Sequence, residues 1–328
     1  MTTGLWAAVS GLPAAAVLAA VPPACRRTVD AATAWSEGDA MIVETPAWPA
    51  DGATHFVPAF SALTDAPFSV RLELSARTGG AWSPWVAGVG LGPAPFAPLA
   101  DAPPLSVDVD VFRAAAPVDA VRLRARVRAP VSAAIVGAPW LLTLSAADSA
   151  PAAPGAVTGR ARLAVPALSQ METDAAIARR ICSPACVAMV LDFWRRPVAP
   201  AALAAEMFHP GTDLYGVWPA AVLAAGRRGI AGYLLRFPDW SAAAWCLEQG
   251  LPVIASIRYA AGELSNAAIA ETSGHLIVLA GIDHDHALVN DPAAATAGTV
   301  PRRYEIAELS RVWLDRTGVG YVLFPPRR

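Results

Sequence analysis

The chain has 328 residues, which is enough for two domains with separate hydrophobic cores. Apolar residues make up 55% of the chain and charged residues 16%, and this composition excludes an intrinsically disordered protein. The formal net charge of −2 provides no basic surface of the kind that binds nucleic acid. All 25 basic residues are arginine, and the four cysteines show no spacing typical of a disulfide framework or a zinc site.

Residues 1–33 contain an uncharged, apolar stretch, 4–24, that fits either a secretion signal or a structured first segment. Against a signal, no basic residue precedes the stretch, and Arg26 and Arg27 follow it. Three prolines within the stretch argue against a membrane-spanning helix, and no later stretch is long and apolar enough to cross a membrane. The composition therefore leaves the cellular compartment undetermined.

Residues 34–146 are predicted to form an all-β sandwich domain, because short apolar or alternating segments are separated by Gly, Pro and Asp turns. The predicted strands are 55–60, 68–76, 81–88, 105–112, 120–128 and 134–144. In strand 120–128, four arginines alternate with apolar residues, so one face is buried and the other faces water.

The charged residues and the tryptophans of this domain each allow two interpretations. Asp108 and Asp110 alternate with valines, so cross-strand pairs between these aspartates and the arginine row are expected, with an anion-binding arginine stripe as the alternative. Trp82 and Trp85 are three positions apart and are predicted to point to opposite faces of their strand. Packing in the core or at an edge is favoured over stacking on a sugar or a peptide.

Residues 147–160 are rich in Ala, Pro and Gly and lack periodicity, so they are predicted to be a linker. Residues 161–328 are predicted to form an α+β domain, with helices first and an antiparallel sheet after them. The predicted helices are 184–195, 200–207, 219–228, a helix that Asp239 caps and Gly250 ends, and 306–314. The predicted strands are 162–168, 232–237, 252–259, 275–282, 287–290 and 321–324.

Cys182 lies at the mouth of a predicted helix. Pro184 suits the first helical position, Ser183 is a good capping residue, and the apolar residues that follow recur at helical spacing. The positive end of a helix stabilises a thiolate, so Cys182 is a candidate nucleophile. The alternative interpretation is a small buried cysteine without chemistry.

Of the five histidines, His275 alone begins an apolar strand, where an imidazole is costly to bury without polar partners. A hairpin through the polar turn 283–286 would bring Asp291 close to His275, and its carboxylate would then orient the ring. Gln170 lies upstream of Cys182 and carries an amide that would donate to a developing oxyanion. Taken one by one, His275 also fits a satisfied core histidine and Asp291 also fits the start of a turn.

Two further regions are of interest. The turn 283–286 reads Asp-His-Asp-His, which is a set of metal-ligand types, although a solvated hairpin turn is the preferred interpretation. Loops 208–217 and 260–272 are predicted to be cleft walls, because loops on a rigid scaffold usually carry specificity.

The chain order of these residues resembles the C39-like family of papain-fold cysteine peptidases. The matching motifs are Ser169-Gln170, Cys182-Ser183-Pro184, Ala188-Met189-Val190-Leu191, Gly274-His275-Leu276-Ile277-Val278 and Asn290-Asp291-Pro292. The resemblance covers about the C-terminal half, and Ser183 departs from the glycine that the family usually has beside the nucleophile. The Gly-Gly-Ala-Trp-Ser-Pro-Trp region resembles, more loosely, the β-sandwich that often precedes C39-like domains.

The resemblance implies a papain-like α+β peptidase domain that follows an all-β sandwich domain. It implies a cysteine peptidase or amide hydrolase without cofactor or metal, in which Cys182 is the nucleophile, His275 the base, Asp291 the orienting carboxylate and Gln170 the oxyanion donor. The substrate would be a peptide or another amide, with cell-wall material as one alternative. A transglutaminase-like acyl transferase and an inactive peptide- or cell-wall-binding module stay open, as does the oligomeric state.

Overall fold

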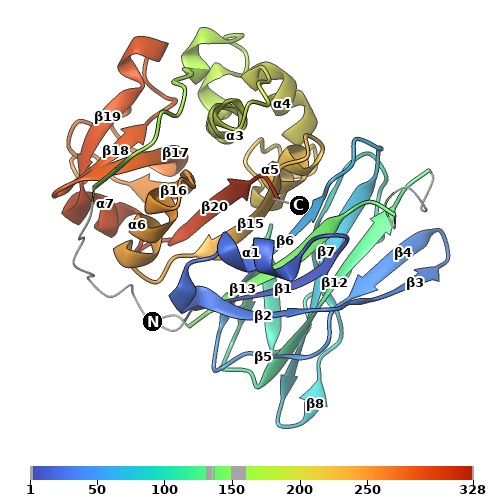
Figure 1. The fold of residues 1–328 in the computed structure, drawn as a ribbon. Coiled ribbons are helices and arrows are strands. Elements are labelled where there is room, and N and C mark those ends of the chain that lie inside the picture. Colours follow the sequence, from blue (N-terminus) through green and yellow to red (C-terminus); the bar gives the residue numbers. More distant parts are fainter. Residues whose placement is uncertain (1–2, 131–134, 136, 149–159, 327–328) are drawn as a thin grey trace. The chain divides into compact units, whose positions relative to one another are not determined.

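The computed structural model describes residues 3–130, 135, 137–148 and 160–326, which fall into two compact units (Figure 1). The first unit contains the described residues up to 148, and the second contains most of those from 160 onward. The predicted linker falls almost entirely on residues 149–159, which lie outside the described ones. None of the described helices is long and apolar enough to span a membrane.

Two sheets build the first unit. One sheet has the order β10-β11-β6-β13-β1-β2, formed by β1 (Thr3–Ser10), β2 (Arg26–Asp30), β6 (His55–Ala62), β10 (Leu105–Asp108), β11 (Val111–Ala114) and β13 (Trp140–Ala147). The other has the order β3-β4-β12-β7-β8, with two more strands beside it, and consists of β3 (Thr33–Glu37), β4 (Ala40–Glu44), β5 (Trp48–Pro49), β7 (Ser69–Thr78), β8 (Ala81–Trp82), β9 (Val86–Leu91) and β12 (Ala120–Arg128). A short helix, α1 (Ala14–Ala19), follows β1.

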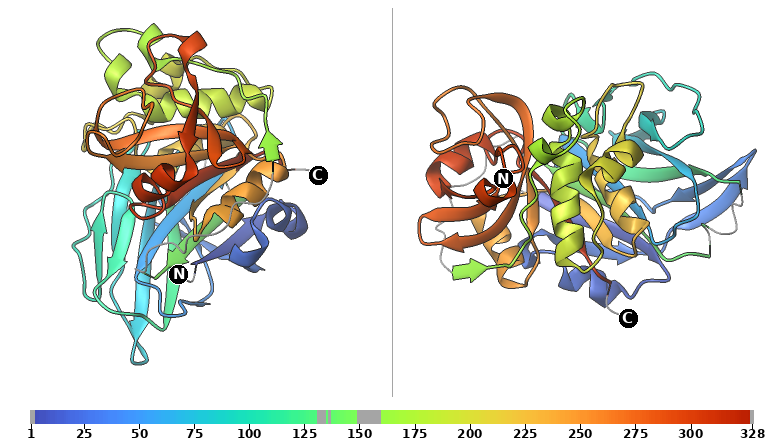
Figure 2. Two further views of the ribbon diagram at one scale, coloured as in Figure 1. Left: turned by 90° about the vertical axis from the view of Figure 1, so that its left-hand side faces the viewer. Right: turned by 90° about the horizontal axis from the view of Figure 1, so that it is seen from above.

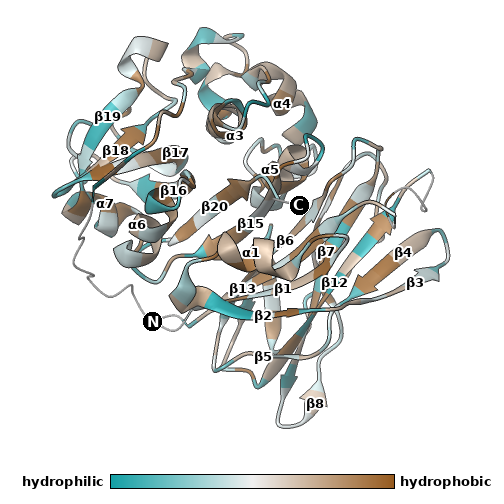
Figure 3. Ribbon diagram, viewed as in Figure 1, coloured by the Kyte–Doolittle hydropathy of each residue, from teal (hydrophilic) through white to brown (hydrophobic). Residues whose placement is uncertain are grey.

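Aromatic side chains fill the core of this unit. Phe60 on β6 meets Phe68, which precedes β7, edge to face with ring centroids 6.3 Å apart, so this contact joins the two sheets. Phe60 also lies 6.1 Å from the ring of Trp140 on β13. The strongly apolar strands, such as β4 in this unit, stand out in brown in Figure 3.

The strands of the first unit differ in part from those predicted. The predicted strand 105–112 is a hairpin of β10 and β11, because Val109 adopts a left-handed φ of 58° and the Asp110 N–H donates to the Asp108 carbonyl at 2.8 Å. Residues Thr3–Ser10 of the segment 1–33 form β1, which lies between β13 and β2 in one sheet. Strands β3 and β4 were not predicted.

The arginine row of β12 is paired, but not with Asp108 and Asp110. Its neighbours are β4 and β7, and these strands supply the acids. Arg124 reaches Glu44 at 3.2 Å and Glu73 at 3.4 Å. The tryptophans stack on the same row, because the guanidinium carbon of Arg122 lies 4.2 Å from the ring centroid of Trp82 and 5.3 Å from that of Trp85. Both rings therefore share one face, and the predicted opposite faces were wrong.

The second unit combines five described helices with one sheet. The helices are α3 (Cys182–Phe193), α4 (Pro200–Met207), α5 (Trp218–Gly226), α6 (Trp240–Glu248) and α7 (Ile306–Val312). The strands are β14 (Arg160–Arg162), β15 (Ala231–Arg236), β16 (Val253–Tyr259), β17 (Thr272–Asp283), β18 (His286–Asn290), β19 (Pro301–Glu305) and β20 (Val319–Phe324). The sheet order is β15-β20-β16-β17-β18-β19, and β14 also pairs with β17.

Local sequence explains most of these elements. Helix α4 has its predicted bounds, and α6 begins after Asp239, whose Oδ1 accepts the Ala242 N–H at 2.9 Å. Gly250 ends that helix with a φ of 78°, a conformation that glycine adopts freely. The predicted strand 162–168 is wrong, since only Arg160–Arg162 pairs with β17. Strand β19 was not predicted.

Helix α3 is the central helix of this unit. Residues 183–191 are all buried, so the helix is surrounded by protein on every side instead of presenting one apolar stripe. Figure 2 shows it beside the strands of the sheet, and it contacts β17 directly. This packing fixes the position of the first turn, which carries Cys182.

Candidate active site

Cys182 is the first residue of α3 and is partly exposed, whereas the residues that follow are buried. The predicted cap is wrong: Ile181 occupies the N-cap position, and the hydroxyl of Ser183 is buried without a hydrogen bond to any described residue. Pro184 is therefore the third helical residue, which is harmless because the N–H groups of a first turn have no intrahelical acceptor. The Cys182 and Ser183 N–H groups belong to that same set of donors.

The pKa of the Cys182 thiol lies below its ordinary value. Burial raises it, but the hydrogen bond from His275 and the positive charge of that ring lower it by more. Backbone hydrogen bonds that involve Leu276 and Ser183 add to the lowering. A thiol in this setting ionises more readily than a free cysteine, and the thiolate is the nucleophilic form.

His275 and Asp291 lie on one hairpin and face each other. His275 is on β17, Asp291 follows β18, and the turn between the strands is the predicted one. The His275 Nε2 and the Asp291 Oδ1 are 2.8 Å apart, and the two residues are 3% and 0% exposed. The sequence-predicted pair is therefore in direct contact, in a place that water does not reach.

Charge explains the protonation of this pair. Burial alone lowers the pKa of His275, but the Asp291 carboxylate, its hydrogen bond and the Cys182 thiolate together raise that pKa to about 10. Burial raises the pKa of Asp291, yet the His275 charge and hydrogen bonds from His275, Tyr304 and the Ala293 N–H bring it below the usual value. The lowered pKa of Cys182, the raised pKa of His275 and the lowered pKa of Asp291 all favour an imidazolium between a thiolate and a carboxylate.

Tyr304 is a site residue that sequence reasoning missed. It lies on β19, is fully buried, and donates its hydroxyl to the Asp291 Oδ2 at 2.6 Å. Burial and the nearby carboxylate raise the pKa of Tyr304, so its hydroxyl stays protonated and remains a donor. The available signal was a tyrosine inside the polar segment Pro-Arg-Arg-Tyr-Glu, which has no strong strand pattern.

Replacing Tyr304 by phenylalanine is expected to reduce the stability of the second unit by about 1–3 kcal/mol, because a buried carboxylate oxygen loses its donor. Thermal unfolding at neutral pH measures the effect. Tyr259→Phe is the matched control, since that hydroxyl donates to the neutral Ile269 carbonyl at 3.1 Å, and a smaller loss is expected there. Equal losses in both variants would contradict a special role for Tyr304.

Gln170 is buried, and it is hydrogen-bonded both to the segment before α3 and to the segment after Asp291. Its Nε2 donates to the Ala178 carbonyl at 2.8 Å, and its backbone N–H donates to the Pro292 carbonyl at 2.9 Å. Its Oε1 is buried with no hydrogen-bond partner among the described residues. Among the described residues, no hydrogen bond joins the Gln170 side chain to Cys182, His275 or Asp291.

Cys186 lies one turn after Cys182 and behaves differently. It is fully buried, and its Sγ donates to the Leu276 carbonyl at 3.2 Å. Burial raises its pKa well above the ordinary value, and the charges of Cys182 and Asp291 raise it further. Cys186 therefore remains a thiol where Cys182 ionises.

Loop 208–217 borders the first turn of α3. An added Cβ at Gly216 would lie 3.8 Å from the Ser183 Cβ, and Arg180, just before α3, forms an ion pair with Asp213 at 2.8 Å. Leu214 in this loop is 43% exposed, so its apolar side chain is accessible to a ligand. The structure thus brings one of the two predicted cleft loops next to Cys182.

The turn 283–286 is held by neighbouring charges. Asp283 pairs with Arg303 at 3.1 Å, Asp285 pairs with His286 at 2.6 Å, and Arg160 contacts His284. Among the residues that the structure describes, no group of three or more His, Cys, Asp or Glu side chains is arranged to hold a metal ion.

Comparisons with known proteins found one family model and several solved structures. The model of the Peptidase_C39 like family matches residues 162–321, whereas no curated protein matches the chain. The peptidase domain of Streptococcus ComA, a bi-functional ABC transporter involved in a quorum-sensing pathway, is similar over 49% of this chain and 98% of its own, with 17% identity and a TM-score of 0.36. A structure described as a C39-like peptidase from Bacillus anthracis is similar over 52% of this chain and 99% of its own, with 16% identity and a TM-score of 0.40.

A third solved structure is a double-glycine-motif protease from an AMS/PCAT transporter in complex with a leader peptide. It is similar over 51% of this chain and 99% of its own, with 20% identity and a TM-score of 0.34. The family match includes every residue of the candidate site, from Gln170 to Tyr304. Residues 162–321 of this chain belong to the Peptidase_C39 like family.

Proposed function

We propose that the chain is a cysteine peptidase that cleaves a peptide or related amide bond through Cys182, His275 and Asp291. The observation that carries the proposal is the buried contact of 2.8 Å between His275 and Asp291, joined to a thiol of lowered pKa at a helix N-terminus. This is the arrangement that nucleophilic catalysis requires, with a nucleophile, a base and a group that orients the base.

In the proposed reaction the Cys182 thiolate attacks the carbonyl carbon and forms a C–S bond. The tetrahedral intermediate collapses, the C–N bond breaks, and the His275 imidazolium gives its proton to the leaving amine. Water then attacks the thioester with His275 as the base, which releases the acid and restores the thiol. Asp291 holds the ring in position and stabilises its charge throughout.

The oxyanion would be bound by donors at the first turn of α3. The Cys182 N–H belongs to that turn, and donors at a helix N-terminus suit a developing negative charge. We assign the second donor to Gln170, because one N–H of its amide is not used for the Ala178 carbonyl. Exposed Leu214 and the neighbouring loop would contact the substrate beside the nucleophile.

We also propose that the second unit is papain-like, since it combines a cysteine on a buried helix with a histidine on an adjacent antiparallel strand. The two sheets of the first unit would form a sandwich-type accessory domain that binds a partner or a polymer. These assignments rest on element order and pairing.

Labelling with a thiol-directed electrophile across pH, read at each cysteine by mass spectrometry, tests the proposed nucleophile. Fast labelling is expected at Cys182 well below roughly pH 8.5, where a free thiol is mostly protonated. Cys186 serves as an internal control, and slow labelling is expected there because it is buried with a raised pKa. His275→Ala should slow the Cys182 reaction, since the imidazolium that stabilises the thiolate is gone.

The same experiment separates the alternatives. Labelling of Cys182 at the rate of a free thiol, unchanged in His275→Ala, would sink the peptidase proposal and favour a binding module. If Cys182 is labelled as expected, incubation of the protein with a peptide library and a primary amine distinguishes hydrolysis from acyl transfer. Products that carry the amine in place of a free acid would contradict hydrolysis.

A further inference from the structure

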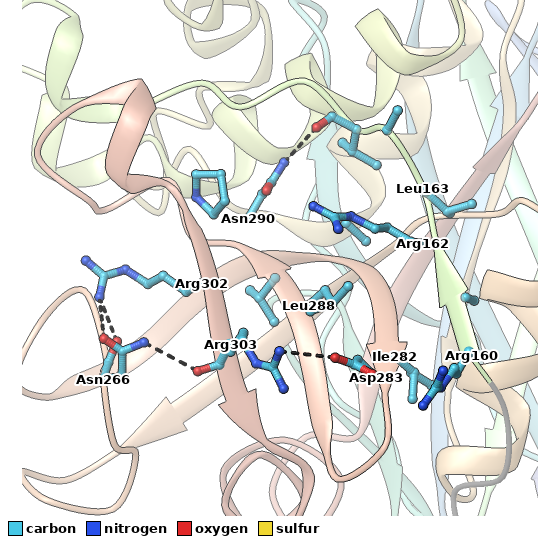
Figure 4. Close-up of a pocket in the computed structure, with 16 residues that line it drawn as sticks. Arg160, Arg162, Leu163, Asn266, Ile282, Asp283, Leu288, Asn290, Arg302 and Arg303 are labelled. Atoms are coloured by element: carbon cyan, nitrogen blue, oxygen red, sulfur yellow. Dashed lines mark hydrogen bonds and ion pairs between the residues drawn. The ribbon is translucent and has the colours of Figure 1, made fainter.

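A pocket of about 1120 Å³ lies on the second unit and is lined by residues of β18. Asn290, the last residue of β18, lines this pocket, and Asp291, the next residue, contacts His275. Figure 4 shows its two walls: residues 160–165 on one side and β19 on the other, with β18 between them. The Asn290 Nδ2 donates to the Val165 carbonyl at 3.1 Å and so holds one wall in place.

The charge of the pocket is one-sided. Four arginines line it, against a single aspartate, and they are Arg160, Arg162, Arg302 and Arg303. Arg303 is paired with Asp283, but Arg162 is exposed, and its side chain makes no hydrogen bond or ion pair with any residue that the structure describes. In Figure 4 the Arg162 side chain extends from its wall toward β18.

Arg302 adds a donor held in a fixed position. The Asn266 carbonyl accepts from its terminal guanidinium at 2.7 Å, which fixes the side chain. Its Nε is buried and has no partner among the described residues, and a buried donor without an acceptor is costly. The pocket thus has guanidinium N–H groups without an acceptor on both walls, and guanidinium groups match carboxylates in shape and charge.

The floor and the size of the pocket favour a peptide over a small anion. Leu163, Leu288 and Ile282 contribute apolar surface between the arginines. A volume of about 1120 Å³ is far larger than one phosphate or carboxylate needs, and it suits a ligand of several residues. A phosphate would use the arginines but would leave the apolar floor uncovered.

We propose that this pocket binds an acidic stretch of a peptide, with its carboxylates between Arg162 and Arg302 and its aliphatic groups over Leu288. The identification of that peptide as a substrate rests on the proposed peptidase function, whereas the binding itself does not. Because Asn290 lines the pocket and the next residue, Asp291, contacts His275, a bound stretch would lie within reach of the same substrate chain that enters the catalytic site. The pocket would then select substrates by residues away from the bond that is cut.

Direct binding tests this proposal without catalysis. Fluorescence anisotropy would be measured on Cys182→Ala protein with a fluorescein-labelled peptide of three Gly-Glu-Leu-Glu repeats, and with the same peptide carrying Gln for Glu. The Glu peptide is expected to bind and the Gln peptide to bind much more weakly. Arg162→Glu should weaken binding of the Glu peptide by about tenfold or more, because an attractive charge becomes a repulsive one.

A matched control removes the effect of net charge. Arg196→Glu makes the same charge change at an exposed position outside the pocket and should alter binding by less than about twofold. The proposal would be overturned if both variants weakened binding equally or if Arg162→Glu did not weaken binding. It would also be overturned if tripolyphosphate displaced the labelled peptide at a lower concentration than the unlabelled Glu peptide does. Binding as expected together with an unreactive Cys182 would keep the pocket and reject the peptidase.

Discussion

Asp291→Asn is expected to lower kcat/KM for peptide hydrolysis by roughly a thousandfold or more. The asparagine amide keeps the shape of the side chain but cannot stabilise an imidazolium, and it favours the wrong ring tautomer. Thiol labelling at Cys182 should slow as well, because the thiolate depends on the charged ring that the Asp291 carboxylate maintains. Initial rates on a peptide identified by profiling measure the first effect.

The pH dependence of kcat/KM should also differ between Asp291→Asn and the parent protein. The carboxylate raises the pKa of His275 to about 10, so the parent protein should keep its thiolate–imidazolium pair up to that pH and lose activity above it. Without the carboxylate the pKa of His275 falls, and the alkaline limb of kcat/KM should move toward neutral pH. Tyr304→Phe is the control, since it keeps the negative charge and should move the limb much less. An unchanged limb in Asp291→Asn would show that the aspartate does not set the protonation of His275.

Glu73→Gln is expected to reduce the free energy of unfolding of the first unit by about 3–5 kcal/mol. The Glu73 carboxylate is fully buried on β7 and pairs with Arg71 at 2.6 Å, with Arg126 at 3.1 Å and with Arg124 at 3.4 Å. A neutral amide there leaves three largely buried guanidinium groups with less negative charge to compensate them. Hydrogen exchange by mass spectrometry should report a loss of protection of roughly two orders of magnitude or more in β7 and β12, and little change in the second unit.

Glu37→Gln provides the control for that experiment. Glu37 also pairs with Arg126, at 2.7 Å, but its side chain is 51% exposed, so water replaces the lost interaction. Its exchange pattern should remain close to that of the parent. A Glu73 variant as well protected as the Glu37 variant would show that the buried cluster contributes no net stability.

Alternating and apolar patterns predicted individual elements well. The alternation of Arg and apolar residues placed β12 at 120–128, and the run after Gly274 placed the core of β17. Strand 105–112 failed because one residue, Val109, turns the chain with a positive φ, a conformation that valine seldom adopts. The start of α3 was misplaced because Ser183 and Pro184 form a plausible cap, whereas the helix begins at Cys182 with Ile181 at the N-cap position.

Partners across the sheet were harder to predict than elements. The arginines of β12 were assigned to Asp108 and Asp110 because those residues show the same alternation, but strand order is set by packing and placed Glu44 and Glu73 beside them. The contact between His275 and Asp291 was predictable, since a tight hairpin leaves little freedom for its two ends. Tyr304 was not, because β19 follows a loop and carries no pattern of its own.

The hairpin that carries His275 and Asp291 has a consequence for the order of folding. These two residues are only 16 positions apart, so their contact closes a short loop, whereas α3 meets β17 through a contact such as Cys186 to Leu276, 90 positions apart. Loop closure over the longer distance costs more entropy, and we expect α3 to join the preformed hairpin late. Until it does, Cys182 lacks the imidazolium that lowers its pKa and remains an ordinary thiol. If Cys182 is the proposed nucleophile, it would therefore not attack unfolded segments of its own chain before α3 has joined the hairpin.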